Sequence, residues 1–81
     1  MRITIDHSSS YYGVPVILDD AGHLIDYAPG IKAARKKLSL TAAQLAEKLG
    51  VSERTVNGWE QGRMPEVAAL NMLGKLLRKI Q

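Results

Sequence analysis

The sequence predicts a small, mainly α-helical domain preceded by a short antiparallel β-hairpin or sheet. From residue 31 onward, apolar residues recur at three- and four-residue intervals, the spacing that places side chains on one face of a helix. Residues 1–28 instead hold short runs of β-branched residues separated by residues that favour turns. Capping residues and glycines divide the second part into short helices. A chain of 81 residues allows one core, too small to enclose a sizeable substrate cavity.

The N-terminal extension, residues 1–28, is predicted to form two or three strands. The expected strands are residues 2–7, 14–18 and 23–27, where β-branched and other apolar residues alternate or cluster. The acidic, glycine-containing residues 19–22 suit a hairpin turn. Because Pro15 has no amide hydrogen, we expect it on an edge strand or at the first position of its strand. Residues 7–13 are expected to be a polar link.

A first helix is predicted over residues 31–38. Pro29 and Gly30 come directly before it and mark the passage from the sheet to the helices. One stripe of this helix carries Ile31, Ala34, Arg35 and Leu38. Arg35 is the charged residue on an otherwise apolar stripe, so its side chain needs a partner.

Residues 40–62 predict two short helices joined by one tight turn. Thr41 caps the first helix, because its hydroxyl accepts a free amide hydrogen while the side chain of Gln44 reaches back in a capping box. Gly50 ends this helix, since the residue after a helix commonly has a positive φ that glycine adopts most readily. Ser52 then caps the second helix.

The second helix of this pair, residues 52–61, is predicted to have one buried and one open face. Only three residues reverse the chain, so the two helices must cross steeply, with the small Ala46 at their closest approach. Val56 and Trp59 face back toward the first helix. The outer face carries Glu53, Arg54, Thr55, Asn57 and Gly58. Such short or polar side chains can hydrogen-bond to base edges and phosphates in a major groove.

A final helix is predicted to begin at Pro65, because proline is favoured at a helix start. Its apolar run is Val67, Leu70, Leu73, Leu76 and Leu77. The basic residues near its end are Lys75, Arg78 and Lys79. These cations suit the negative end of the helix dipole, so they need no contact with DNA.

With these residues in view, the chain resembles the XRE family, the Cro/repressor type of helix-turn-helix with a lambda-repressor-like fold. The likeness spans residues 31–77 and is carried by the pattern LT..QLA..LGVS..TV..WE.GR..P. The resemblance implies a four- to five-helix DNA-binding domain over residues 29–81, packed with the N-terminal extension as one small domain. It also implies double-stranded DNA as the partner. The alternative interpretation of the same pattern is an αα-hairpin that serves packing alone.

The resemblance implies roles for the matching positions. Base contacts are expected from Glu53, Arg54, Thr55, Asn57 and Gly58. Backbone contacts are expected from Thr41, Gln44, Lys48, Ser52 and Arg63. Structural roles are expected from Arg35, Glu60, Ala46, Gly50, Val56 and Trp59, with an ion pair between Arg35 and Glu60.

Relatives often carry a glutamine where this chain has Ala42, so one familiar contact is absent and base reading shifts to the first turn after Ser52. Arg54 is the foremost candidate, because a guanidinium can engage O6 and N7 of guanine together. Glu53 either accepts from a cytosine amine or only stabilises the helix dipole. Gly58 either lets the backbone approach the groove or is a tolerated weak spot, about 1 kcal/mol worse than alanine.

Charge divides along the chain. Residues 1–30 hold one arginine against four aspartates, a net charge of −3, whereas residues 31–81 hold ten lysines and arginines against four glutamates, a net charge of +6. A polyanion such as DNA would be attracted to the second part, with an affinity that falls as salt rises. Some of these cations are also expected simply to be solvated.

No enzymatic activity, metal site or cofactor is expected. The chain has no cysteine, which removes disulfides and thiolate ligands, and His7 and His23 show no spacing typical of a metal site or a nucleophile and base. No apolar run approaches the roughly 20 residues of a membrane span, and residues 1–6 lack the apolar run of a signal peptide. A cytoplasmic location is the corresponding expectation.

The predicted function is a sequence-specific DNA-binding transcriptional regulator, a repressor that binds operator DNA as a homodimer through residues 52–61. Two copies on half-sites about 10 base pairs apart would supply the specificity that one helix-turn-helix lacks. Either the exposed edge of the first strand or the last helix could supply the dimer contact. The alternative is an antitoxin of a toxin–antitoxin pair, or another protein-binding module, whose N-terminal hairpin grips a partner.

Overall fold

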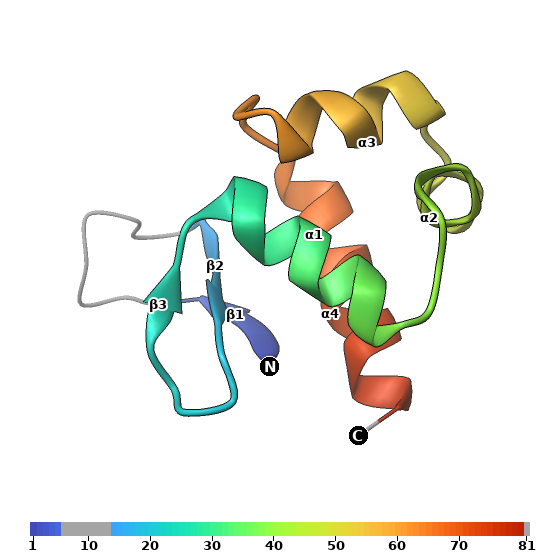
Figure 1. Cartoon of the computed structure of the whole chain (residues 1–81). Helices are drawn as coiled ribbons and strands as arrows, with labels where there is room; N and C mark the ends of the chain where they lie inside the picture. The colour runs from blue at the N-terminus through green and yellow to red at the C-terminus, as the bar shows by residue number, and fades with distance from the viewer. Residues whose placement is uncertain (6–13, 81) are drawn as a thin grey trace.

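The computed structural model describes residues 1–5 and 14–80, which form three strands and four helices (Figure 1). The strands are β1 (Arg2–Ile5), β2 (Pro15–Leu18) and β3 (Leu24–Ile25). The helices are α1 (Tyr27–Lys37), α2 (Ala42–Leu49), α3 (Glu53–Glu60) and α4 (Val67–Lys79). The predicted mainly helical fold class with a small N-terminal sheet is therefore confirmed. The predicted polar link, residues 7–13, lies outside the described residues, as does the end of the predicted first strand.

The sheet is antiparallel with the strand order β1-β2-β3. Ile17 lies at its centre, paired with Ile3 on one side and Ile25 on the other. Pro15 is the first residue of the central strand, so the second of the two expected positions holds and the edge position does not. A strand's first position tolerates proline because its missing amide hydrogen costs the ladder least there.

The turn between β2 and β3 is organised by Asp19. Its Oδ1 accepts hydrogen bonds from the amides of Ala21, at 2.9 Å, and His23, at 2.8 Å. Gly22 has a φ of 85°, a conformation that glycine adopts most easily. These local bonds explain why an acidic, glycine-containing segment was a sound turn prediction.

The start of α1 was predicted wrongly. The helix begins at Tyr27, four residues before residue 31, and the predicted third strand is correspondingly shorter. Pro29 lies in the first turn, where its missing amide hydrogen costs little because the amides of that turn have no acceptor within the helix. Gly30 is buried inside the helix, and a β-carbon there would lie 2.8 Å from Cδ1 of Ile17. These two residues therefore let the helix start early and approach the sheet, rather than separating the two.

The start of α4 also differs from the prediction. Glu66 is the N-cap residue, and the buried Pro65 precedes the helix instead of beginning it. Val67, the first member of the predicted apolar run, is 45% exposed, whereas Ala69 is buried. The buried stripe of α4 is Ala69, Leu70, Leu73, Gly74 and Leu77. The helix is thus rotated so that Gly74 faces Ile3 of β1, where a β-carbon would lie 3.3 Å from that of Ile3.

One apolar core joins the sheet to the helices. Its fully buried members include Ile17, Ile31, Ala34, Leu45, Val56, Leu70, Leu73 and Leu77. The sheet contacts α1 and α4, whereas α3 contacts α1 and α2 (Figure 1). The outer face of α3 therefore points away from both the core and the sheet.

Candidate nucleic-acid interface

The start of α2 is fixed by its own side chains. Oγ1 of Thr41 accepts from the amide of Gln44 at 3.1 Å, and Oε1 of Gln44 accepts from the amide of Thr41 at 2.9 Å. Both capping groups are thereby engaged with the helix, and both residues remain exposed. Gly50 ends α2 with a φ of 72°, and the amide of Val51 donates back to the carbonyl of Ala46 at 3.0 Å. The direction in which the chain enters α3 follows from this turn.

The start of α3 is fixed in the same way by Ser52. Its Oγ accepts from the amide of Thr55 at 3.1 Å and shares a hydrogen bond with Oγ1 of Thr55 at 2.8 Å. The carboxylate of Glu53 lies in the first turn, where it also favours the helix dipole. This position suits both roles expected of Glu53, a contact with a cytosine amine and stabilisation of the helix dipole.

The inner face of α3 is held by the core. Val56 is fully buried, Trp59 is 2% exposed, and Ala46 of α2 is 3% exposed. With this face fixed, the outer face presents Glu53, Arg54 and Asn57 to solvent, while Thr55 and Gly58 are half-buried. All five residues expected to contact bases thus lie on one short helix, three of them fully open.

The chain turns back on itself directly after α3. Gly62 has a φ of 114° and donates its amide to the carbonyl of Trp59 at 3.1 Å, while the amide of Arg63 donates to the carbonyl of Gly58 at 2.9 Å. This pair of bonds is the Schellman ending, in which the second residue past the cap returns to the last turn. Arg63 is therefore brought back beside α3.

One shallow hollow collects several of these residues on the outer face of α3. It is lined by Arg54, Asn57, Gly58, Gln61 and Arg63. Gln61 was not among the predicted contacts. It lies seven residues after Arg54, so the spacing that places residues on one helix face could have identified it. A second hollow, along α2, brings Gln44 and Lys48 together with Leu40 and Glu47.

An ion pair ties the end of α3 to α1. Nε of Arg35 donates to Oε2 of Glu60 at 2.8 Å, and Nη2 donates to Oε1 at 3.1 Å. The remaining Nη1 donates to the carbonyl of Leu40 at 3.2 Å. The two side chains are only 18% and 12% exposed, and the hydrogen bonds to Glu60 raise the pKa of Arg35 above its ordinary value. The expected pair is present, and it fixes how α3 is held against α1.

Residues 31–79, more than half of the chain, match the family model of Helix-turn-helix (HTH_3). The chain belongs to this helix-turn-helix family. The resemblance to the Cro/repressor type, the XRE family, is confirmed, and the chain is in general terms a DNA-binding regulator. Families of this kind are generally not enzymatic. No curated protein and no solved structure matches the chain.

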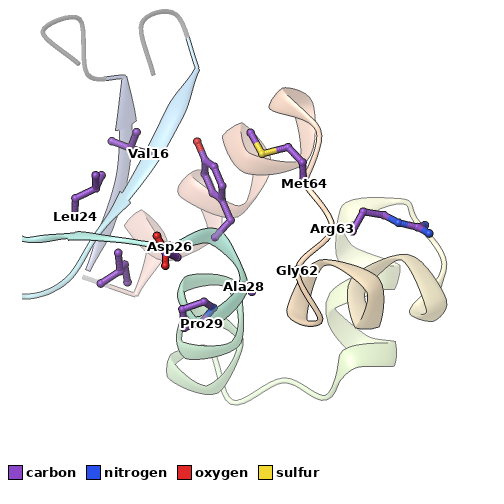
Figure 2. A pocket seen from close by; sticks show the side chains of 10 residues that line it. Val16, Leu24, Asp26, Ala28, Pro29, Gly62, Arg63 and Met64 are labelled. Carbon is purple, nitrogen blue, oxygen red and sulfur yellow. The ribbon is translucent and has the colours of Figure 1, made fainter. Parts of the chain in front are cut away.

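An apolar hollow of this helix-turn-helix protein lies away from the outer face of α3. It has a volume of about 330 Å³ and is lined mainly by Val16, Leu24, Ile25, Tyr27, Pro29 and Met64. The hydroxyl of Tyr27, one of the lining residues, donates to the carbonyl of Pro15 at 2.6 Å. Figure 2 shows that the side chain of Arg63, at the rim, extends away from this hollow. The arginine thus belongs to the surface of α3.

Two features are absent from the described part of this helix-turn-helix protein. Within residues 1–5 and 14–80, no cluster of three or more histidine or acidic side chains could hold a metal ion. No described helix has both the length and the apolar composition needed to cross a bilayer.

Proposed function

We propose that the protein is a sequence-specific transcriptional repressor that binds operator DNA through α3 as its recognition helix. The observation that supports this most directly is the division of α3 into two faces. Its inner face is locked into the core by Val56 and Trp59, and its outer face is polar and open. An α-helix with a free polar face can enter the major groove, which is about 12 Å wide.

The proposed base contacts follow from what each side chain can donate or accept. Arg54 is exposed in the first turn, where its guanidinium can reach O6 and N7 of one guanine. Asn57 can hydrogen-bond an adenine edge from the next turn. Glu53 would accept from a cytosine amine, and Thr55, whose hydroxyl is shared with Ser52, would contact a base at the half-buried flank. Gly58 has no side chain that could hydrogen-bond a base.

The proposed backbone contacts surround the helix on two sides. Thr41, Gln44 and Lys48 are exposed on α2, and Ser52 is exposed at the start of α3. Arg63 lies at the far end of α3. Contacts of this kind fix the register of a protein on the duplex without reading sequence.

The proposal includes a homodimer on two half-sites about 10 base pairs apart, because one recognition helix reads too few base pairs to find an operator. Repression would follow from occlusion of a promoter by the bound dimer. A cytoplasmic location is part of the proposal, since a regulator must reach its DNA.

The test is selection of bound sequences from a random DNA pool, followed by binding measurements for Arg54→Ala and Arg63→Ala across a salt series. We expect Arg54→Ala to relax the preference at about one base position and to weaken binding by ~1–3 kcal/mol. Arg63→Ala should weaken binding to all sequences and reduce the slope of log K against log salt by about one. Equal, sequence-independent losses for both variants would refute the role given to Arg54.

The second candidate is an antitoxin or other protein-binding module that grips a partner through the N-terminal sheet. It is favoured by the apolar hollow beside β3, where Leu24 is 50% exposed and Met64 is 55% exposed. Deleting residues 1–28 is a poor test, because it removes Ile17 from the core and the first residues of α1. Leu24→Ser is the sharper variant. Loss of co-purification of a partner, with DNA affinity unchanged, would support the antitoxin, and an unchanged set of partners would count against it.

A further inference from the structure

The side chain of Arg63 lies across Gly58. A β-carbon added to Gly58 would lie 3.7 Å from both Cδ and Nε of Arg63 and 3.8 Å from its Cζ. Because the consecutive atoms Cδ, Nε and Cζ lie at nearly equal distances, the end of the Arg63 side chain lies flat over Gly58. The backbone holds the same two residues together through the 2.9 Å hydrogen bond from the amide of Arg63 to the carbonyl of Gly58.

This contact is a consequence of how α3 ends. In a Schellman ending, the side chain two residues past the cap commonly packs against the residue whose carbonyl its amide reaches, usually through an apolar contact. Here the two positions are Arg63 and Gly58, so a basic side chain replaces the usual apolar one. It lies on the backbone of Gly58, and this backbone surface is the seat of Arg63. A side chain at residue 58 larger than that of alanine would occupy this seat.

The seat lies beside Arg54. Residues four apart on a helix are neighbours on one face, so Arg54 and Gly58 are adjacent, and Arg63 completes the same hollow. Its other lining residues are the uncharged Asn57 and Gln61, so within the described residues no carboxylate neutralises the two guanidinium groups there. Two arginines bordering one hollow favour an anion between or beside them.

We propose that Gly58 is a positioning residue that seats Arg63 beside Arg54, so that Arg63 holds a phosphate of the DNA strand whose base Arg54 reads. This inference rests on the proposed function, and it assigns to Gly58 a role other than direct base contact. An arginine that is already held in its binding position loses less rotamer freedom when it meets DNA.

The test is a double-mutant cycle on a fluorescein-labelled duplex that carries the sequence enriched from the random pool. Gly58→Leu fills the seat, whereas Gly58→Ala adds only a methyl group at an ordinary contact distance and is the matched control. Both changes replace glycine within a helix by a better helix former, so both variants should fold, which thermal melting followed by circular dichroism verifies.

We expect Gly58→Leu to weaken binding about tenfold, as Arg63→Ala does, because a charged hydrogen bond to phosphate is lost in each. Gly58→Ala should stay within about twofold of the wild type. The variant with both Gly58→Leu and Arg63→Ala should bind no more weakly than Arg63→Ala alone, since both changes remove the same interaction.

Two results would overturn the inference while leaving the proposed function intact. Gly58→Leu could lower the affinity for DNA by the same factor with Arg63 present and with Arg63→Ala. In that case the leucine collides with DNA directly and does not act through Arg63. If Gly58→Leu binds like the wild type, the seat has no role. Failure of the wild-type protein to enrich any sequence would instead refute the proposed function, and the inference with it.

Discussion

Gly30 and Gly58 both lie inside helices, yet their surroundings assign them opposite physical roles. A β-carbon at Gly30 would meet Ile17 at 2.8 Å from Cδ1 and 3.2 Å from Cγ2, whereas a β-carbon at Gly58 would find its nearest neighbour at 3.7 Å. The sequence shows two glycines in helical segments and cannot distinguish them. They differ in the side chain that lies opposite each one, which comes from strand β2 for Gly30 and from the loop after α3 for Gly58. The predicted passage at Pro29 and Gly30 was wrong for this reason.

Gly30→Ala should therefore destabilise the protein although alanine is the better helix former. Overpacking a filled core costs about 1–3 kcal/mol, which exceeds the gain of about 1 kcal/mol in helix propensity. Gly58→Ala, the matched control, should raise the free energy of unfolding by up to about 1 kcal/mol. Urea denaturation of the free protein measures both. A higher free energy of unfolding for both variants would show that the side chain of Ile17 moves to accommodate the added methyl group without strain.

At the scale of elements, α2 and α3 were predictable because the signals that begin and end them are local. Thr41, Gly50 and Ser52 act on amides or backbone angles within three or four residues, so the sequence contains the whole interaction. The early start of α1 goes with the contact of Gly30 with Ile17 of β2, and the rotation of α4 goes with the contact of Gly74 with Ile3 of β1. No short stretch of sequence contains either contact. The same division applies to the candidate site: the outer face of α3 followed from helical spacing, but the seating of Arg63 on Gly58 depends on a turn outside the helix.

The capping box of α2 gives a prediction at this scale. Thr41→Ala removes the acceptor for the amide of Gln44 and should lower the free energy of unfolding by about 0.5–2 kcal/mol. Thr41→Ser retains the hydroxyl and should stay close to the wild type. Chemical denaturation compares the three proteins. Equal stability of the alanine and serine variants would show that the hydroxyl does not stabilise α2.

At the scale of the whole molecule, the turn between β2 and β3 and the helix α3 lie at opposite ends of the fold (Figure 1). Asp19 and Asp20 lie in this turn, whereas Arg54 lies on α3 and Arg63 lies just after its end. The amino group of Met1 and then Lys37 hydrogen-bond Asp20 and lower the pKa of its carboxyl to about 2, and these two cations also offset its negative charge. Under the proposed function, the field of DNA would attract the end with Arg54 and Arg63 more than the turn with Asp19, which favours the approach of α3 to the duplex.

Of the two candidate surfaces for the proposed homodimer, β1 is the stronger. As an outer strand of the sheet, β1 has no partner strand on one side within the described residues, and Ile5 on it is 44% exposed. An edge strand can pair with its symmetry-related copy, which extends the sheet across the dimer. The last helix offers Met72, which is 42% exposed, as the alternative contact.

Ile5→Lys should therefore dissociate the dimer, because two-fold symmetry places the new charge in the interface twice. We expect the dimer dissociation constant to rise at least about tenfold, which corresponds to about 1.4 kcal/mol. Affinity for a duplex with two half-sites should fall with it, while affinity for a single half-site stays unchanged.

Met72→Lys adds the same charge to a similarly exposed residue of α4 and is the matched control. Sedimentation equilibrium measures the association of all three proteins. Dissociation by Met72→Lys with an intact Ile5→Lys dimer would move the interface to α4, and a wild-type protein that is monomeric on and off the two-site duplex would remove the homodimer from the proposed function.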